Sequence, residues 1–130
     1  MPPMTALTFL DFETSDDGEG HVTLDAMASV RPEHLPALQA EVVQVLDWLH
    51  RRFRDGPGPL DEGAPWDADL RASTERSTRE RLRYEPSSRR LITEPATGGE
   101  TVRHTVTLSI AATEAVAQAL GEAFSWGGEG

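Results

Sequence analysis

The sequence contains neither cysteine nor lysine. Without cysteine the chain has no disulfide bond, no thiol nucleophile, no cysteine-ligated zinc and no thiolate-held iron–sulfur cluster. Without lysine, arginine is the only strongly basic side chain, which we attribute to a GC-rich genome. A large part of redox and metal chemistry is therefore excluded from the sequence alone.

Long apolar runs and catalytic motifs are also lacking. The most apolar stretch, Val42 to Leu49, is interrupted by Gln44 and Asp47, whereas a membrane-spanning helix needs about 18 apolar residues. The first residues lack the basic region of a secretory signal. We find no Walker loop, no G-x-G-x-x-G, no G-x-S-x-G and no H-E-x-x-H. We therefore expect a cytoplasmic protein that does not contact membranes. Whether the protein is an enzyme stays open, although the absence of these motifs argues against it.

Acidic residues dominate the charge. The chain has 22 acidic and 12 basic residues, a net charge of −10, which argues against nucleic acid or an anionic membrane as a partner. A length of 130 residues is that of one domain. We expect a disordered N-terminus over residues 1–4, a single domain over 5–124 and a flexible tail over 125–130.

Hydrophobic periodicity predicts the elements of the first half. Thr5 to Phe12 is rich in β-favouring residues, and His21 to Val30 alternates strictly, so we expect two strands joined by a hairpin turn over Glu13 to Gly20. Apolar residues from Leu35 to Phe53 recur every three or four positions, which predicts an amphipathic helix. The following Gly- and Pro-rich stretch, Gly56 to Pro65, predicts an exposed loop.

The second half is predicted to hold further strands and a second helix. Residues 73–80 are left open among a turn, a bulged edge strand and a mobile loop. The predicted segments are strands at Trp66 to Ala72, Glu80 to Glu85, Leu91 to Ile92 and Thr101 to Ile110, turns at Pro86 to Ser88 and Thr97 to Glu100, and a helix at Ala112 to Phe124. The element order indicates an α+β two-layer sandwich in which two helices cover one face of an antiparallel sheet of about four to six strands.

Seven arginines gather between Arg71 and Arg90. The predicted strand places Arg79, Arg81 and Arg83 on one face, beside the strand that holds Arg103. Because the guanidinium fork binds phosphate and carboxylate groups in two places, this face could bind a phosphate, a carboxylate ligand or an acidic peptide. The alternative is a solvated face neutralised by the protein's own carboxylates. Tyr84 is the only aromatic residue among these arginines, which disfavours nucleic acid.

An acidic segment surrounds a large aromatic ring near the middle of the chain. Trp66 stands among four carboxylates, and we expect it either to anchor a basic protein partner or to fold onto the core and fix the loop. The candidate partner-binding residues are Asp61, Glu62, Trp66, Asp67 and Asp69.

The histidines do not follow a metal-ligand spacing. His104 is predicted to point inward from its strand, either as a base or ligand or as a neutral core histidine. The acidic residues from Asp11 to Glu19 do not follow the calcium-loop pattern. We therefore name no catalytic residue, no metal site and no cofactor.

These observations favour a small acidic protein-binding or adaptor domain that recognises a basic protein surface, as secretion chaperones or immunity proteins do; the analogy is one of size, charge and element order. The alternative is an anion- or small-molecule-binding domain that uses the arginine-rich face. An exposed sheet edge in a domain of this size also allows a homodimer.

Overall fold

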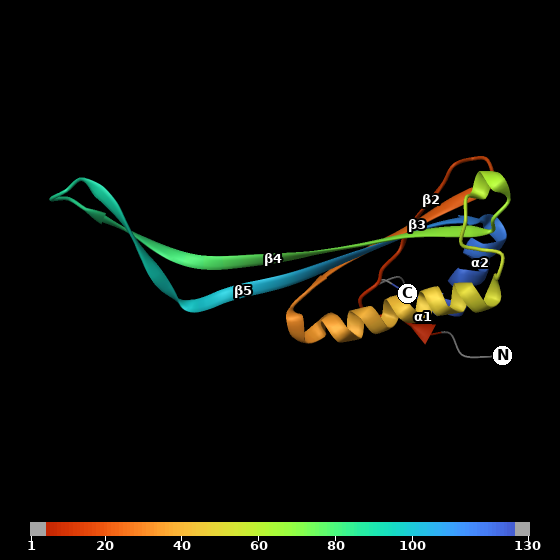
Figure 1. Cartoon of the computed structure of the whole chain (residues 1–130), viewed down its shortest axis with the longest axis horizontal. Coiled ribbons are helices and arrows are strands. Elements are labelled where there is room, and N and C mark those ends of the chain that lie inside the picture. Colours follow the sequence, from red (N-terminus) through yellow and green to blue (C-terminus); the bar gives the residue numbers. More distant parts are fainter. Residues whose placement is uncertain (1–4, 127–130) are drawn as a thin grey trace.

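The computed structural model, which describes residues 5–126, shows an α+β body from which a long two-stranded arm projects (Figure 1). Neither of its two helices has the length and apolarity that crossing a bilayer requires. The elements are β1 (Thr5–Ala6), β2 (Glu13–Asp16), β3 (His21–Val30), a 3-10 turn (Pro32–His34), α1 (Leu35–Arg52), a second 3-10 turn (Leu60–Glu62), β4 (Trp66–Glu85), β5 (Arg90–Thr113), α2 (Glu114–Ala123) and β6 (Phe124–Ser125).

Four strands form an antiparallel sheet in the order β2-β3-β5-β4, and β1 pairs separately with β6 in parallel. Burial along β3 follows the alternation of its sequence, since every second residue from Leu24 to Val30 is buried and the residues between them are exposed. Only one face of the sheet is therefore covered, as the strict alternation predicted. The core on that face also includes Leu38, Val42, Val45 and Leu49 of α1 and Val116 and Leu120 of α2.

Both helices begin and end close to the predicted positions. α1 follows a 3-10 turn that starts at Pro32, and its apolar stripe faces the sheet. α2 begins after Thr113, whose hydroxyl accepts a hydrogen bond from the amide of Val116 at 3.3 Å and so caps the helix. The α+β class, the two helices and the antiparallel sheet are thus confirmed within residues 5–126.

The arm begins where β3 ends. Val30, the last residue of β3, pairs with His104, so between residues 74 and 103 each of the strands β4 and β5 has only the other as a paired strand. The pairing shifts between Thr78, which faces Glu100, and Glu80, which faces Pro95. Beyond this shift lies the part of the arm that we call the distal hairpin, residues 80–95. Figure 1 shows that the ribbon bends and twists along its length.

Three sequence predictions are corrected here. The strand expected over Thr5 to Phe12 covers only Thr5–Ala6, and the partner of β3 is instead Glu13–Asp16, inside the predicted turn. The turn expected at Thr97 to Glu100 is an irregularity within β5, made by Gly98 and Gly99, whose φ angles of 121° and 67° glycine tolerates. Trp66 to Glu85 is one strand, which makes residues 73–80 a bulged edge strand.

The predicted termini are only partly described. Residues 1–4 and 127–130, expected to be disordered and flexible, lie outside the described residues. Of the predicted tail, Ser125 pairs with Ala6, and its carbonyl accepts a hydrogen bond from the amide of Leu7 at 2.8 Å. Trp126 packs edge-on against Phe12, with ring centroids 5.1 Å apart. The described part of the tail therefore contacts the body.

Candidate functional site: the distal hairpin and the groove beside α1

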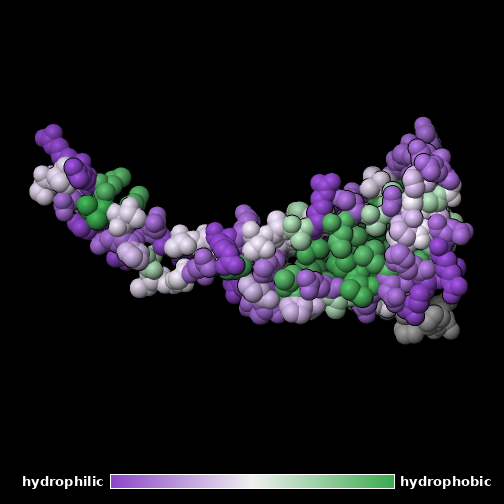
Figure 2. Space-filling view, viewed as in Figure 1, coloured by the Kyte–Doolittle hydropathy of each residue, from purple (hydrophilic) through white to green (hydrophobic). Residues whose placement is uncertain are grey.

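The distal hairpin carries one apolar face. In an antiparallel pair, side chains of directly opposed residues lie on the same face. Leu82 pairs with Thr93 and Tyr84 pairs with Leu91, so Leu82, Tyr84 and Leu91 share one face. Their exposed fractions are 61%, 58% and 64%, and nothing among the described residues covers them. Figure 2 shows hydrophobic side chains near the end of the arm. We call these three residues the apolar arm face.

The opposite face of the distal hairpin is mainly charged and includes one apolar residue, Ile92. Arg81 pairs with Glu94, Arg83 with Ile92, and Glu85 with Arg90. Arg83 also approaches Glu94 diagonally, at 3.7 Å from Nε to Oε1. The pair is half exposed and contributes little stability. The hairpin is therefore amphipathic, although it has no core to cover.

The arm and the body carry opposite charge. Residues 74–103 hold seven arginines and five glutamates, a net charge of +2, whereas the rest of the sequence holds 17 acidic residues and five arginines, a net charge of −12. Since the arm projects away from the body (Figure 1), its distal arginines do not reach the acidic residues of their own body. The charge of each part remains available to another molecule.

A groove runs between α1 and the edge strand β4. It has a volume of about 470 Å³ and is lined mainly by apolar side chains. Val43 of α1 is 63% exposed and Leu70 of the edge strand β4 is 51% exposed. Figure 2 shows this second hydrophobic area on the body. The lining residues are Gln39, Val42, Val43, Leu70, Arg71, Ala72 and Val106, and we call the site the α1–β4 groove.

Trp66 does not lie on the surface. Its side chain has no exposed area, and its indole N–H donates to the carbonyl of Phe53 at 2.9 Å. His50 packs edge-on against its ring at 5.1 Å. Gly56 lies so close to the ring that a Cβ there would stand 2.5 Å from Nε1. Trp66 thus joins the core to the loop that follows α1, and it cannot serve as the exposed partner anchor that we considered from the sequence.

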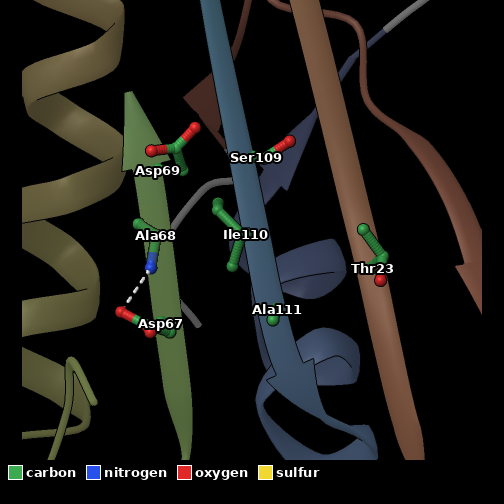
Figure 3. A pocket seen from close by; sticks show the side chains of 7 residues that line it. All are labelled: Thr23, Asp67, Ala68, Asp69, Ser109, Ile110 and Ala111. Atoms are coloured by element: carbon green, nitrogen blue, oxygen red, sulfur yellow. Dashed lines mark hydrogen bonds between the residues drawn. The ribbon is translucent and has the colours of Figure 1, made fainter. Parts of the chain in front are cut away.

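The four carboxylates around Trp66 are dispersed. Asp61 and Glu62 are exposed in the second 3-10 turn. Asp67 and Asp69 lie on the uncovered face of the sheet, in a shallow pocket of about 300 Å³ that Thr23 and Ser109 also line (Figure 3). Asp67 accepts a hydrogen bond from the amide of Ala68 at 3.0 Å (Figure 3), and Asp69 is paired with Arg71 at 2.7 Å. These contacts leave the carboxylates directed to solvent but do not gather them into one site.

The predicted arginine cluster is spread along the arm. Arg103 pairs with Glu75 in the ladder and donates to the hydroxyl and the carbonyl of Ser29, at 2.8 and 3.0 Å. Arg81 stands opposite Glu94 in the distal hairpin, six residues beyond Glu75, which corresponds to about 20 Å along a strand. Arg79 lies between them at the register shift. The structure therefore does not bring Arg103 together with the other three arginines.

His104 and the acidic turn have local roles. His104 is half-buried at the base of the arm, and its Nδ1 is 3.0 Å from the hydroxyl of Thr74. In the acidic turn, hydrogen bonds from the amides of Glu19 and His21 to the Asp17 carboxylate lower the pKa of Asp17. Within residues 5–126 no group of three or more His, Asp or Glu side chains is arranged to hold a metal ion.

Comparison with protein-family models, with curated proteins and with solved structures finds no match.

Sequence reasoning missed the apolar arm face, although the signal is present. Between Arg79 and Glu85 the arginines occupy the odd positions and define the predicted basic face. Leu82 and Tyr84 occupy the even positions between them, and such alternation marks the other face of the same strand. What the sequence could not show is that this strand leaves the body, so that its apolar face has no core beneath it.

Proposed function

We propose that this chain is a protein-binding domain that holds its partner with the arm. The observation that carries the proposal is the apolar arm face: Leu82, Tyr84 and Leu91 lie exposed on one side of a hairpin that touches no other part of the described chain. Exposed apolar clusters rimmed by charged residues mark interaction sites in soluble proteins. Tyrosine is also enriched where interfaces gain most of their energy.

The architecture of the arm supports a partner for a second reason. An isolated two-stranded hairpin is only marginally stable in water, and a hairpin gains stability when a third strand or a packed surface covers it. Beyond His104 both outer edges of the ribbon offer free backbone N–H and C=O groups. A protein surface can supply both apolar contacts and backbone hydrogen bonds, whereas a small ligand cannot cover a face of this length.

The negative charge of the body adds a second feature to the proposed interaction. Asp61, Glu62 and Asp69 remain exposed on a body of strongly negative charge, which favours a partner with a basic surface beside the one that the arm contacts. The alternative function, an anion-binding domain, rests on Arg79, Arg81, Arg83 and Arg103. Their spacing along the arm suits a row of separate contacts with an extended acidic surface better than a single small anion.

The proposal is tested by photo-crosslinking in cells. A benzophenone amino acid placed at Tyr84 is expected to form a covalent adduct with a protein, because that side chain lies at the centre of the apolar arm face. The matched control is the same probe at the neighbouring Arg83, which lies on the charged face, and at Gln118, which is exposed on α2. Adducts that are absent at Tyr84, or that form equally at all three positions, would overturn the proposal.

A further inference from the structure

We infer that the partner of the apolar arm face is a second copy of this chain, whose α1–β4 groove receives it. This inference rests on the proposed function, since it names the partner of the same face. In the resulting dimer each copy extends its arm to the other, so that two equal contacts form around a two-fold axis.

The two surfaces match in chemistry. The arm offers three exposed apolar side chains on one side of a narrow ribbon. The groove offers Val43 and Leu70, both more than half exposed, along the free edge of β4. Docking would remove both apolar surfaces from water, and it would place a strand of the incoming arm beside β4, which no other described strand pairs with on that side. Either surface alone is an exposed apolar patch that would favour non-specific association.

Charge favours contact between arm and body over contact between two arms. The arm carries a net charge of +2 and the rest of the chain −12, so that an arm is attracted to the body of another copy, while two arms repel each other. This is the complementarity expected of a specific interface.

The dimensions also fit. The 12 residues from Thr74 to Glu85 extend about 40 Å at the rise of a strand, and the 18 residues of α1 extend about 27 Å at the rise of a helix. An arm that starts at the edge of one body is thus long enough to lie along the groove of its neighbour. One such contact is small, but symmetry doubles it, which brings the buried area toward the range of stable dimers.

Three glutamate substitutions test the inference by sedimentation equilibrium. Leu91→Glu disrupts the apolar arm face, Val43→Glu disrupts the groove, and Met27→Glu, on the uncovered sheet face at 69% exposure, serves as the control for an added charge on an exposed apolar residue. We expect the wild-type chain to dimerise between about 1 and 100 μM, and each of the first two variants to weaken the dimer by about tenfold or more. Met27→Glu should leave the dissociation constant within about threefold. Thermal melts establish that all three variants fold.

Mixing the variants identifies the contact. A Leu91→Glu chain retains its groove and a Val43→Glu chain retains its arm, so an equal mixture restores one intact contact and should dimerise more tightly than either variant alone. A wild-type chain that stays monomeric over this range would overturn the inference. So would a dimer that Leu91→Glu disrupts and Val43→Glu does not, since the arm would then dock elsewhere. A monomer whose Tyr84 probe still crosslinks to another protein would refute the second copy and leave the proposed function standing.

Discussion

Glu41 is a buried carboxylate whose removal should destabilise the body strongly. It lies on the sheet-facing side of α1 with 8% of its surface exposed. Its two oxygens accept three backbone N–H groups, from Thr8 at 2.6 Å, Phe9 at 2.9 Å and Leu10 at 3.0 Å. The segment between β1 and β2 has no strand partner there, so this side chain replaces the sheet as the acceptor for its backbone.

The size of the effect follows from the burial of the three donors. In Glu41→Ala the amide of Leu10 stays buried without a partner, which destabilises by about 1–3 kcal/mol, and the amides of Thr8 and Phe9, which water reaches, lose about 0.5–1.5 kcal/mol each. We therefore expect a loss of about 4 kcal/mol in the free energy of unfolding. Glu41→Gln keeps one carbonyl oxygen for Phe9 and Leu10 and turns its amide toward Thr8, so the loss should be about 1–2 kcal/mol.

Urea denaturation monitored by circular dichroism measures these values. The matched control is Asp47→Asn, which neutralises an exposed carboxylate of the same helix that is paired with Arg51 at 2.8 Å. It should change the free energy of unfolding by less than about 1 kcal/mol. A loss below about 1 kcal/mol for Glu41→Ala, or a loss equal to that of the control, would refute the role assigned to Glu41.

The remaining predictions concern the loop, the first turn and the arm. Trp66→Ala should lower the free energy of unfolding by about 3–5 kcal/mol. Gly56→Ala should lower it by about 1–3 kcal/mol, because the new methyl group meets the indole ring. Urea denaturation of both variants measures these losses, and wild-type stability for either variant would contradict the prediction. An NMR titration should give Asp17 a pKa below its ordinary value of 3.8. The stability that the Asp17 carboxylate adds is therefore complete above the unfolded pKa and disappears as the pH falls through the lowered folded pKa. Asp17→Asn should remove this pH dependence. Replacing residues 79–99 by an Asn-Gly turn should leave the thermal stability of the body almost unchanged, since every core side chain lies outside that range; loss of the cooperative melt would show that the arm takes part in the core.

The body could be predicted from the sequence because its periodicities are long and strict. The alternation from His21 to Val30 and the helical spacing from Leu35 to Phe53 each repeat often enough to outweigh local exceptions, and both elements lie close to the predicted positions. The segment from Thr8 to Leu10 was predicted as a strand because its residues favour one. Three bonds to a helix carboxylate hold it instead, and a contact over more than 30 residues leaves no trace in a local pattern.

The candidate site was the least predictable part. A Gly-Gly pair usually marks a turn, so the sequence predicts a turn over Thr97 to Glu100 and separate short strands on either side of it. In the structure the same glycines supply a break in the ladder that lets β5 continue. Nothing local distinguishes the two outcomes, because glycine tolerates positive φ equally well in a turn and in a bulge.

Once the register is known, the alternation of apolar and charged residues in the distal hairpin needs a different explanation from the alternation in the body. Leu82 and Tyr84 alternate with Arg81, Arg83 and Glu85 as apolar and polar residues do in the strands of the body, and in the body that alternation is explained by a core on one face. The distal hairpin keeps the alternation without the core. A chain that needed only a soluble hairpin would be served by polar residues on both faces. These apolar positions, which nothing among the described residues covers, are why we propose that a partner's surface covers them.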